Sequence, residues 1–306
     1  MSIEVEIERW RGLSTGELMA RALKLKLARR GASFSFCSII NAKSGRCSED
    51  CRYCAQSGHY QTEAPVYPLK GRAEIVAAAR AAQEAGASRF SLVTSGRGLP
   101  EDEIEPVAEA IAAVRDEVGI KVCGSFGILD DQALGRLKAA GMSRYHHNLE
   151  SSRRFFPRVT TTHHFDDRVA TVCAAREVGL EVCSGGIFGL GESEEDRISM
   201  ALSLRELGVD SVPINILIPL PGTPLAETKP LSVGEIVRSI ALYRLLLPQV
   251  CLRLAGGREV ALDDFLAAAF TAGADGMMIG GYLTRRGRPV EADRRFAQEM
   301  ISLWSS

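Results

Sequence analysis

The chain has 306 residues and a net charge of −1; 46% of its residues are hydrophobic and 25% are charged. This length and composition allow a sizeable core in one large domain or two ordinary ones. The near-zero charge, the lack of a basic run and the lack of a bilayer-long apolar run argue against nucleic acid and membranes as partners. Eight cysteines without a secretion signal indicate the cytoplasm, where thiols more often ligate metals or serve catalysis than form disulfides.

The first ten residues, MSIEVEIERW, are acidic and amphipathic, which does not fit a signal peptide. Residues 14–30 predict a helix before the first strand that covers one end of the fold. No linker or low-complexity stretch interrupts the chain. We therefore expect a single domain over 1–306, with a helical extension over about 1–33.

A repeated unit follows, in which each helical pattern ends in a residue that breaks the helix and then runs into a strand. Glycines that fit the left-handed position after a helix end six of these patterns: Gly86, Gly119, Gly141, Gly179, Gly208 and Gly273. Pro248 takes this place in one further unit. With the first strand, eight strands alternate with amphipathic helices, which predicts an α/β fold, a parallel (β/α)8 barrel of TIM type. A doubly wound open sheet is the weaker alternative, because no GxGxxG motif follows a strand.

The loop after the first strand reads CSEDCRYC, with Cys47, Cys51 and Cys54 spaced CxxxCxxC. Three thiols can hold three corners of a four-iron cube and leave one iron open to a chelating molecule. A zinc loop that borrows His59 is the alternative, although this spacing is not a usual zinc pairing. Loops that follow the strands form the face of such a barrel that carries active sites.

Alternate side chains of a strand face opposite ways, which divides each strand into an outer and an inner set. The outer set is apolar and should pack on the helices: Val122, Val182, Val212, Ile214, Ile216, Leu252 and Leu254. The inner set is mostly polar or carries sulfur: Lys121, Cys123, Ser125, His146, Asn148, Glu150, Glu181, Cys183, Gly185, Ser211, Pro213, Asn215, Cys251, Arg253 and Ala255. Such barrels usually fill their interior with branched aliphatic side chains. This interior is therefore expected to hold reactants.

Several segments resemble the biotin synthase family of radical S-adenosylmethionine (SAM) enzymes. The CxxxCx(aromatic)C signature is specific for the superfamily, and YHHNLE, EVCSGGIFGLGE, VPINILIPLPGTPL and RLAGGRE extend the similarity across most of the chain. The resemblance implies that Cys47, Cys51 and Cys54 hold a [4Fe–4S] cluster whose open iron binds SAM. Reductive cleavage of SAM would give a 5′-deoxyadenosyl radical, which takes hydrogen from C9 and then C6 of dethiobiotin. Sulfur from a second, auxiliary iron–sulfur cluster would complete biotin.

The same resemblance assigns four binding residues. The backbone of Tyr53 would contact the adenine, and Asn148 and Glu150 would hold the ribose and the neighbourhood of the substrate. Asn215 would hold the ureido ring, since an amide both donates and accepts hydrogen bonds. The alternative is that the inward Asn and Glu side chains only satisfy one another in a polar core.

The ligands of the auxiliary cluster depart from the family pattern. The family places cysteines on the second, third and fifth strands and an arginine on the seventh. Here Cys123, Cys183 and Arg253 are present, but the second-strand residue is Ser91, a poor replacement for a thiolate. Cys37 on the adjoining first strand is the expected substitute, with an ordinary buried thiol as the alternative.

Three thiolates suit a four-iron cluster with one open iron. We expect an auxiliary cluster of this type, whose open iron carries the sulfide that is inserted. Arg253 would then be a nearby cation, and Arg89 would help to offset the thiolate charge. The alternative is a [2Fe–2S] cluster held by Cys37, Cys123, Cys183 and Arg253.

The remaining cysteines, Cys173 and Cys251, are expected to be structural. One of His163 and His164 is expected either to reach the SAM carboxylate or to be a solvated loop histidine. The competing functions are a hydrogenase-maturase-like radical enzyme and a non-catalytic cluster or zinc protein. The resemblance implies a flavodoxin- or ferredoxin-type electron donor, resupply of sulfur by an iron–sulfur assembly system, and a homodimer.

Overall fold

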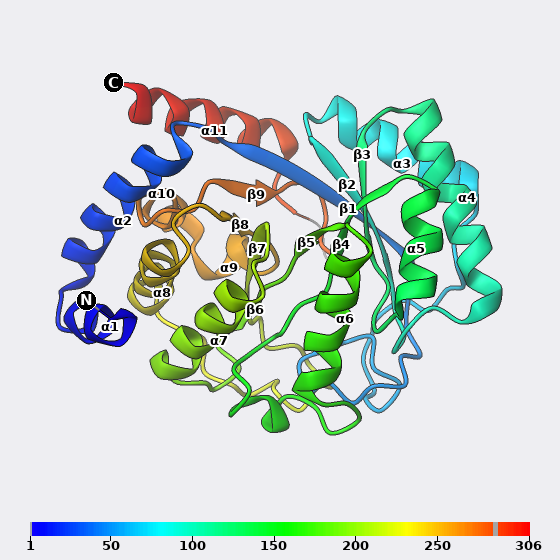
Figure 1. The fold of residues 1–306 in the computed structure, drawn as a ribbon, viewed down its shortest axis with the longest axis horizontal. Coiled ribbons are helices and arrows are strands. Elements are labelled where there is room, and N and C mark those ends of the chain that lie inside the picture. Colours follow the sequence, from blue (N-terminus) through cyan, green and yellow to red (C-terminus); the bar gives the residue numbers. More distant parts are fainter. Residues whose placement is uncertain (1, 284–286) are drawn as a thin grey trace.

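The computed structural model describes residues 2–283 and 287–306. A parallel β-barrel lies at its centre, with helices around it (Figure 1). The strand order β5-β4-β3-β2-β1-β9-β8-β7-β6 is closed by a pairing of β5 with β7. The strands are β1 (Ser35–Lys43), β2 (Arg89–Thr94), β3 (Lys121–Ser125), β4 (Met142–His146), β5 (Glu181–Cys183), β6 (Gly186–Phe188), β7 (Ser211–Ile216), β8 (Cys251–Leu254) and β9 (Gly276–Met278).

The predicted TIM-type barrel is confirmed, but its fifth position is built from two short strands. β5 and β6 both pair with β7, Cys183 with Ser211 and Gly186 with Ile214. Between them, the backbone of Gly185 approaches β7 so closely that a Cβ atom would lie 2.0 Å from the Pro213 carbonyl oxygen. Only glycine fits at this approach.

The outer layer consists of helices that connect the strands and bury their apolar faces. They are α3 (Arg72–Glu84), α4 (Glu101–Glu117), α5 (Asp131–Ala139), α6 (Phe165–Glu177), α7 (Glu194–Glu206), α8 (Val233–Leu246), α9 (Arg258–Ala261) and α10 (Leu266–Thr271), with 3-10 turns at Phe156–Arg158 and Asp263–Phe265. All six cap glycines have positive φ, from 60° at Gly208 to 116° at Gly141, as predicted. The predicted outer set of strand residues is at most 4% exposed, so the core lies between the sheet and the helices. No helix of the described residues is long and apolar enough to cross a membrane.

Two helices precede β1, where one was expected: α1 (Ile3–Arg11) and α2 (Thr15–Arg30). α2 begins with a capping box formed by Ser14 and Glu17. It packs along the outer helices α8 and α10, not across one end of the barrel as expected. The C-terminal helix α11 (Val290–Ser305), which was not predicted, lies on the same side of the molecule as α2 (Figure 1). There Trp304 stacks on Phe34 of the segment that enters β1.

A fully buried ion pair ties α8 to the strands that follow it. Arg244 of α8 lies 2.7 Å from the carboxylate of Asp275, just before β9. Its guanidinium also donates to four backbone carbonyls, those of Leu247, Pro248, Val250 and Gly273. One side chain thus satisfies the carbonyls that end α8 and lead into β8.

We expect Arg244→Met to lower the free energy of unfolding by about 3 kcal/mol, because it leaves four buried carbonyls without this donor and removes the buried partner of the Asp275 carboxylate. Arg30, 3.1 Å from Asp275, would remain as a partly exposed partner of that carboxylate. The matched control is Arg72→Met, which removes an exposed pair with Glu117 and should cost less than about 1 kcal/mol. Urea unfolding followed by circular dichroism measures both values, and equal losses would contradict the prediction.

Candidate active site

A central cavity lies inside the barrel and opens toward the loops that follow the strands. Its lining includes Cys37, Arg89, Ser91, Cys123, Arg144, His146, Asn148, Glu150, Cys183, Asn215 and Arg253. Most of the predicted inner set therefore lines the cavity, but Lys121, Glu181, Gly185, Ser211 and Cys251 do not. That thiol lies at the base of β8, 3.7 Å from Nη2 of Arg253.

The thiols of the loop after β1 lie at the mouth of this cavity. Cys47, Cys51 and Cys54 line one cleft beside Glu150, and Cys54 also lines the central cavity. Local backbone hydrogen bonds fold the loop into a turn, in which Cys54 N donates to Cys51 O at 2.9 Å. Burial raises the pKa of Cys51 to about 12 and that of Cys54 to about 11. Since a metal ligand must be a thiolate, binding a cluster here would release protons.

The three thiols of the loop do not converge on a site for one zinc ion. Among residues 2–283 and 287–306, no three Cys, His, Asp or Glu side chains converge on a single-ion site. The ring of His59, the suggested fourth zinc ligand, is instead 2.9 Å from the carbonyl oxygen of Ser48. A four-iron cube binds its three thiolates through three different irons. The thiolate ligands of such a cube therefore lie further apart than thiolates that share one zinc ion.

Polar groups from the segment after β4 face the same cleft. Asn148 donates to Glu150 Oε2 at 3.3 Å and accepts from Gly185 N at 3.1 Å, so these inward side chains partly satisfy each other. Glu150 has a left-handed φ of 67°, an uncommon conformation for a non-glycine residue that is often found at functional sites. Arg168 of α6 lies 3.7 Å from Glu150 Oε1. Sequence reasoning missed Arg168, because no strand periodicity marks a helix residue that reaches the cavity.

A second trio of thiols meets deeper in the barrel. Cys37 on β1, Cys123 on β3 and Cys183 on β5 line the central cavity together. Burial raises the pKa of Cys123 to about 11, and the nearby Cys183 and Cys37 add to this effect. Ser91 pairs in register with Cys123 and lines the same cavity, but it offers no thiol.

Three arginines surround this trio. Arg89 and Arg144 both bind the carboxylate of Glu181, and Arg253 donates to the backbone and the hydroxyl of Ser35 at 3.1 Å. Arg144 was overlooked, although it shares the inward face of β4 with His146. Their positive charge fits a site for a cluster with thiolate ligands.

The remaining candidates lie in different surroundings. His163 is buried, so only the exposed His164 matches the expected solvated loop histidine. Cys173 lies partly exposed in α6. The amide of Asn215 is already bonded to Gly186 O at 3.2 Å and to Gly256 N at 2.9 Å, which leaves it one N–H and one lone pair.

A parallel barrel with a three-thiol loop at the mouth of its polar interior is the architecture of a radical SAM enzyme. Residues 42–204 match the Radical SAM superfamily, and residues 213–300 match the Biotin and Thiamin Synthesis associated domain. Methylornithine synthase shares the fold, with a TM-score of 0.81 and 20% identity over 94% of this chain and 88% of that one. An FeFe-hydrogenase maturase from Carboxydothermus hydrogenoformans also shares it, with a TM-score of 0.80 and 21% identity over 94% and 71%.

Comparison at higher identity defines the family. The chain is 51% identical to the biotin synthase of Pelotomaculum thermopropionicum, over 93% of this chain and 88% of the relative. It is 53% identical to that of Heliobacterium modesticaldum, over 86% and 81%. The chain belongs to the biotin synthase family, which confirms the predicted resemblance and implies a [4Fe–4S] cluster and SAM as cofactors.

Proposed function

We propose that this chain converts dethiobiotin to biotin by inserting one sulfur atom between C6 and C9, and that an auxiliary iron–sulfur cluster supplies the sulfur. The observation that carries the proposal is the second thiol trio, Cys37, Cys123 and Cys183, which shares a cavity with the first cysteine loop. Neither a maturase-like function nor a structural cluster protein accounts for a second set of thiols beside the first.

The cleft at the mouth of the barrel would hold SAM. Cys47, Cys51 and Cys54 would ligate the [4Fe–4S] cluster, which supplies the electron for reductive cleavage of SAM. The guanidinium of Arg168 would bind the SAM carboxylate, because its planar fork of donors matches a carboxylate. This role replaces the one considered for His163 and His164, in the loop before α6.

The residues proposed for the nucleoside and the substrate lie along the cavity. Asn148 would donate to or accept from the ribose hydroxyls, Glu150 would accept hydrogen bonds from them, and the backbone of Tyr53 would contact the adenine. Asn215 would bind the ureido ring of dethiobiotin through the donor and acceptor that its protein contacts leave over. These contacts would hold the substrate away from bulk water.

For the auxiliary site we favour a four-iron cluster with an extra sulfide on its open iron. Three thiols line the site, and Arg253 already donates to Ser35 through Nη1 and Nη2. Its guanidinium would therefore act as a nearby cation, together with Arg89 and Arg144. The alternative is a [2Fe–2S] cluster for which Arg253 provides the fourth ligand.

The partners and the organisation of the protein belong to the same proposal. A flavodoxin- or ferredoxin-type protein would donate electrons, and an iron–sulfur assembly system would restore the sulfur in a cytoplasmic homodimer. Both family-matched segments contribute strands to one closed sheet, which supports a single domain over 1–306 with a helical extension over about 1–33.

Anaerobic reconstitution followed by turnover tests the proposal. We expect about eight irons per chain, and biotin and 5′-deoxyadenosine as products from dethiobiotin and SAM. About six irons would instead support the [2Fe–2S] alternative. Mass spectrometry identifies the products, and intact clusters that give no biotin would contradict the proposed reaction.

A further inference from the structure

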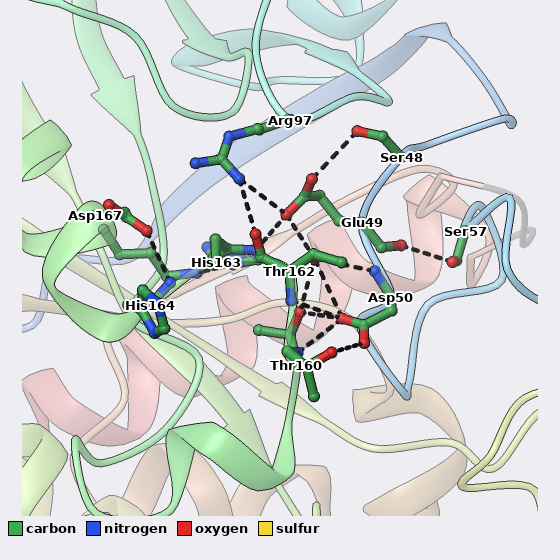
Figure 2. Close-up of polar contacts among 12 residues, drawn as sticks. Ser48, Glu49, Asp50, Ser57, Arg97, Thr160, Thr162, His163, His164 and Asp167 are labelled. Atoms are coloured by element: carbon green, nitrogen blue, oxygen red, sulfur yellow. Dashed lines mark hydrogen bonds and ion pairs between the residues drawn. The ribbon is translucent and has the colours of Figure 1, made fainter.

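Two carboxylates stand between the first two cysteines of the cluster loop, and the proposed reaction uses neither. Figure 2 shows that Glu49 and Asp50 point toward residues 160–163, about 110 positions later in the chain. Asp50 Oδ1 accepts hydrogen bonds from Thr160 Oγ1 at 2.6 Å, from Thr161 N at 2.8 Å and from Thr162 N at 3.2 Å. Asp50 Oδ2 accepts from Thr161 Oγ1 at 2.5 Å. One carboxylate thus binds three consecutive residues of the other segment.

Glu49 makes a second set of contacts to the same segment. Its Oε2 accepts from Thr162 Oγ1 at 2.7 Å and lies 2.5 Å from His163 Nδ1. On the side of the cysteine loop, the backbone carbonyl of Glu49 accepts from Ser57 Oγ at 2.6 Å. The Glu49 carboxylate is buried, and its charge is compensated by Thr162, by His163 and by Arg97 at 3.9 Å.

His163 continues these contacts into the cleft. Arg168 Nε donates to His163 Nε2 at 3.1 Å, so the hydrogen on Nδ1 points to Glu49. Arg168 Nη1 donates to the carbonyl of Asn148 at 2.9 Å. The imidazole thereby connects the cluster loop with the arginine at the mouth of the cavity.

We propose that residues 160–163 form a latch that positions the cluster loop. By binding Glu49 and Asp50, the latch holds Cys47 and Cys51 in place before iron arrives. Cluster assembly then avoids the conformational entropy cost of ordering the loop. By orienting Arg168 through His163, it also couples the loop to the SAM cleft. The inference rests on the proposed cluster at Cys47, Cys51 and Cys54.

Asp50→Asn tests the latch, because it removes the charge and preserves the size. We expect the variant to lose iron from the cluster of this loop to a chelator about tenfold faster than the wild type, as expected for about 1.4 kcal/mol of lost hydrogen-bond energy. The auxiliary cluster in the same molecule is an internal control and should be lost at an unchanged rate. Mössbauer spectra distinguish the two clusters, and Glu63→Gln, an exposed carboxylate 13 residues further on, is the matched control variant.

A second variant changes the latch without touching the loop. Thr160→Val removes one donor to Asp50 and should also accelerate iron loss, and Asp50→Asn combined with Thr160→Val should show less than the sum of the two effects. The latch would be overturned if Asp50→Asn lost iron from the loop cluster at the wild-type rate, or if the effects of Asp50→Asn and Thr160→Val were fully additive. It would also be overturned if Asp50→Asn accelerated iron loss equally at both clusters. A wild-type protein that takes up no iron at the loop would refute the proposed function instead.

Discussion

Cys47→Ala is expected to reduce the formation of 5′-deoxyadenosine to the background level. The loop offers three thiols to a four-iron cube, and the two that remain cannot hold it with a defined open iron. Iron content should fall by about four atoms per chain, while the signal of the auxiliary cluster persists. Anaerobic reconstitution, iron analysis and product detection with a strong chemical reductant measure these effects, and Cys51→Ala and Cys54→Ala should behave alike.

The control for this substitution is Cys173→Ala, which removes a partly exposed thiol in α6, outside both thiol trios. It should retain the full iron content and the full rate of SAM cleavage. If Cys47→Ala cleaved SAM at the wild-type rate, the assignment of the cluster loop would be wrong.

Cys37→Ala is expected to abolish biotin formation and to spare the cleavage of SAM. Cys37 completes the trio with Cys123 and Cys183, and its loss leaves two thiolates for the auxiliary cluster. The first cluster, at the mouth of the barrel, should still form and still cleave SAM. The variant should therefore yield 5′-deoxyadenosine without biotin, which mass spectrometry of a single reaction can show.

Two further variants make this result specific. Cys251→Ala removes a buried thiol at the base of the barrel and should leave biotin formation intact. Ser91→Cys in the Cys37→Ala background restores a thiol in register with Cys123, and it should recover part of the auxiliary iron. Wild-type biotin yields from Cys37→Ala would identify Cys37 as an ordinary buried thiol.

Much of the architecture was predictable, because the signals that encode it are local. A cap glycine such as Gly119 marks a helix end through its own backbone conformation. The alternation in β3 and β8 placed Cys123 and Arg253 on the inward face through geometry that every strand shares. The departure at Ser91 could also be read directly, because a family pattern states which residue type a position should have.

Other features of the site could not be predicted from the sequence, because they depend on contacts between distant segments. Arg168 belongs to a helix whose position against the cleft no local pattern specifies. The fifth barrel strand is broken where Gly185 approaches Pro213 of β7, a contact between segments about 30 residues apart in the chain. Arg144 is an intermediate case, since its inward face was predictable but its pairing with Glu181, 37 residues later, was not.

The sequence alone determined the barrel, the cysteine loop and the polar interior, because helix caps, strand alternation and ligand spacing act over a few residues. The sequence proposed Cys37 as a partner of Cys123 and Cys183 beside the alternative of an ordinary buried thiol, and only the tertiary structure places all three on one cavity. Only the tertiary structure shows that Asp50 binds Thr160. Packing of the barrel brings these groups together from positions at least 60 residues apart in the chain. Such contacts depend on the packing of the whole sheet, and this packing leaves no periodic trace in the sequence.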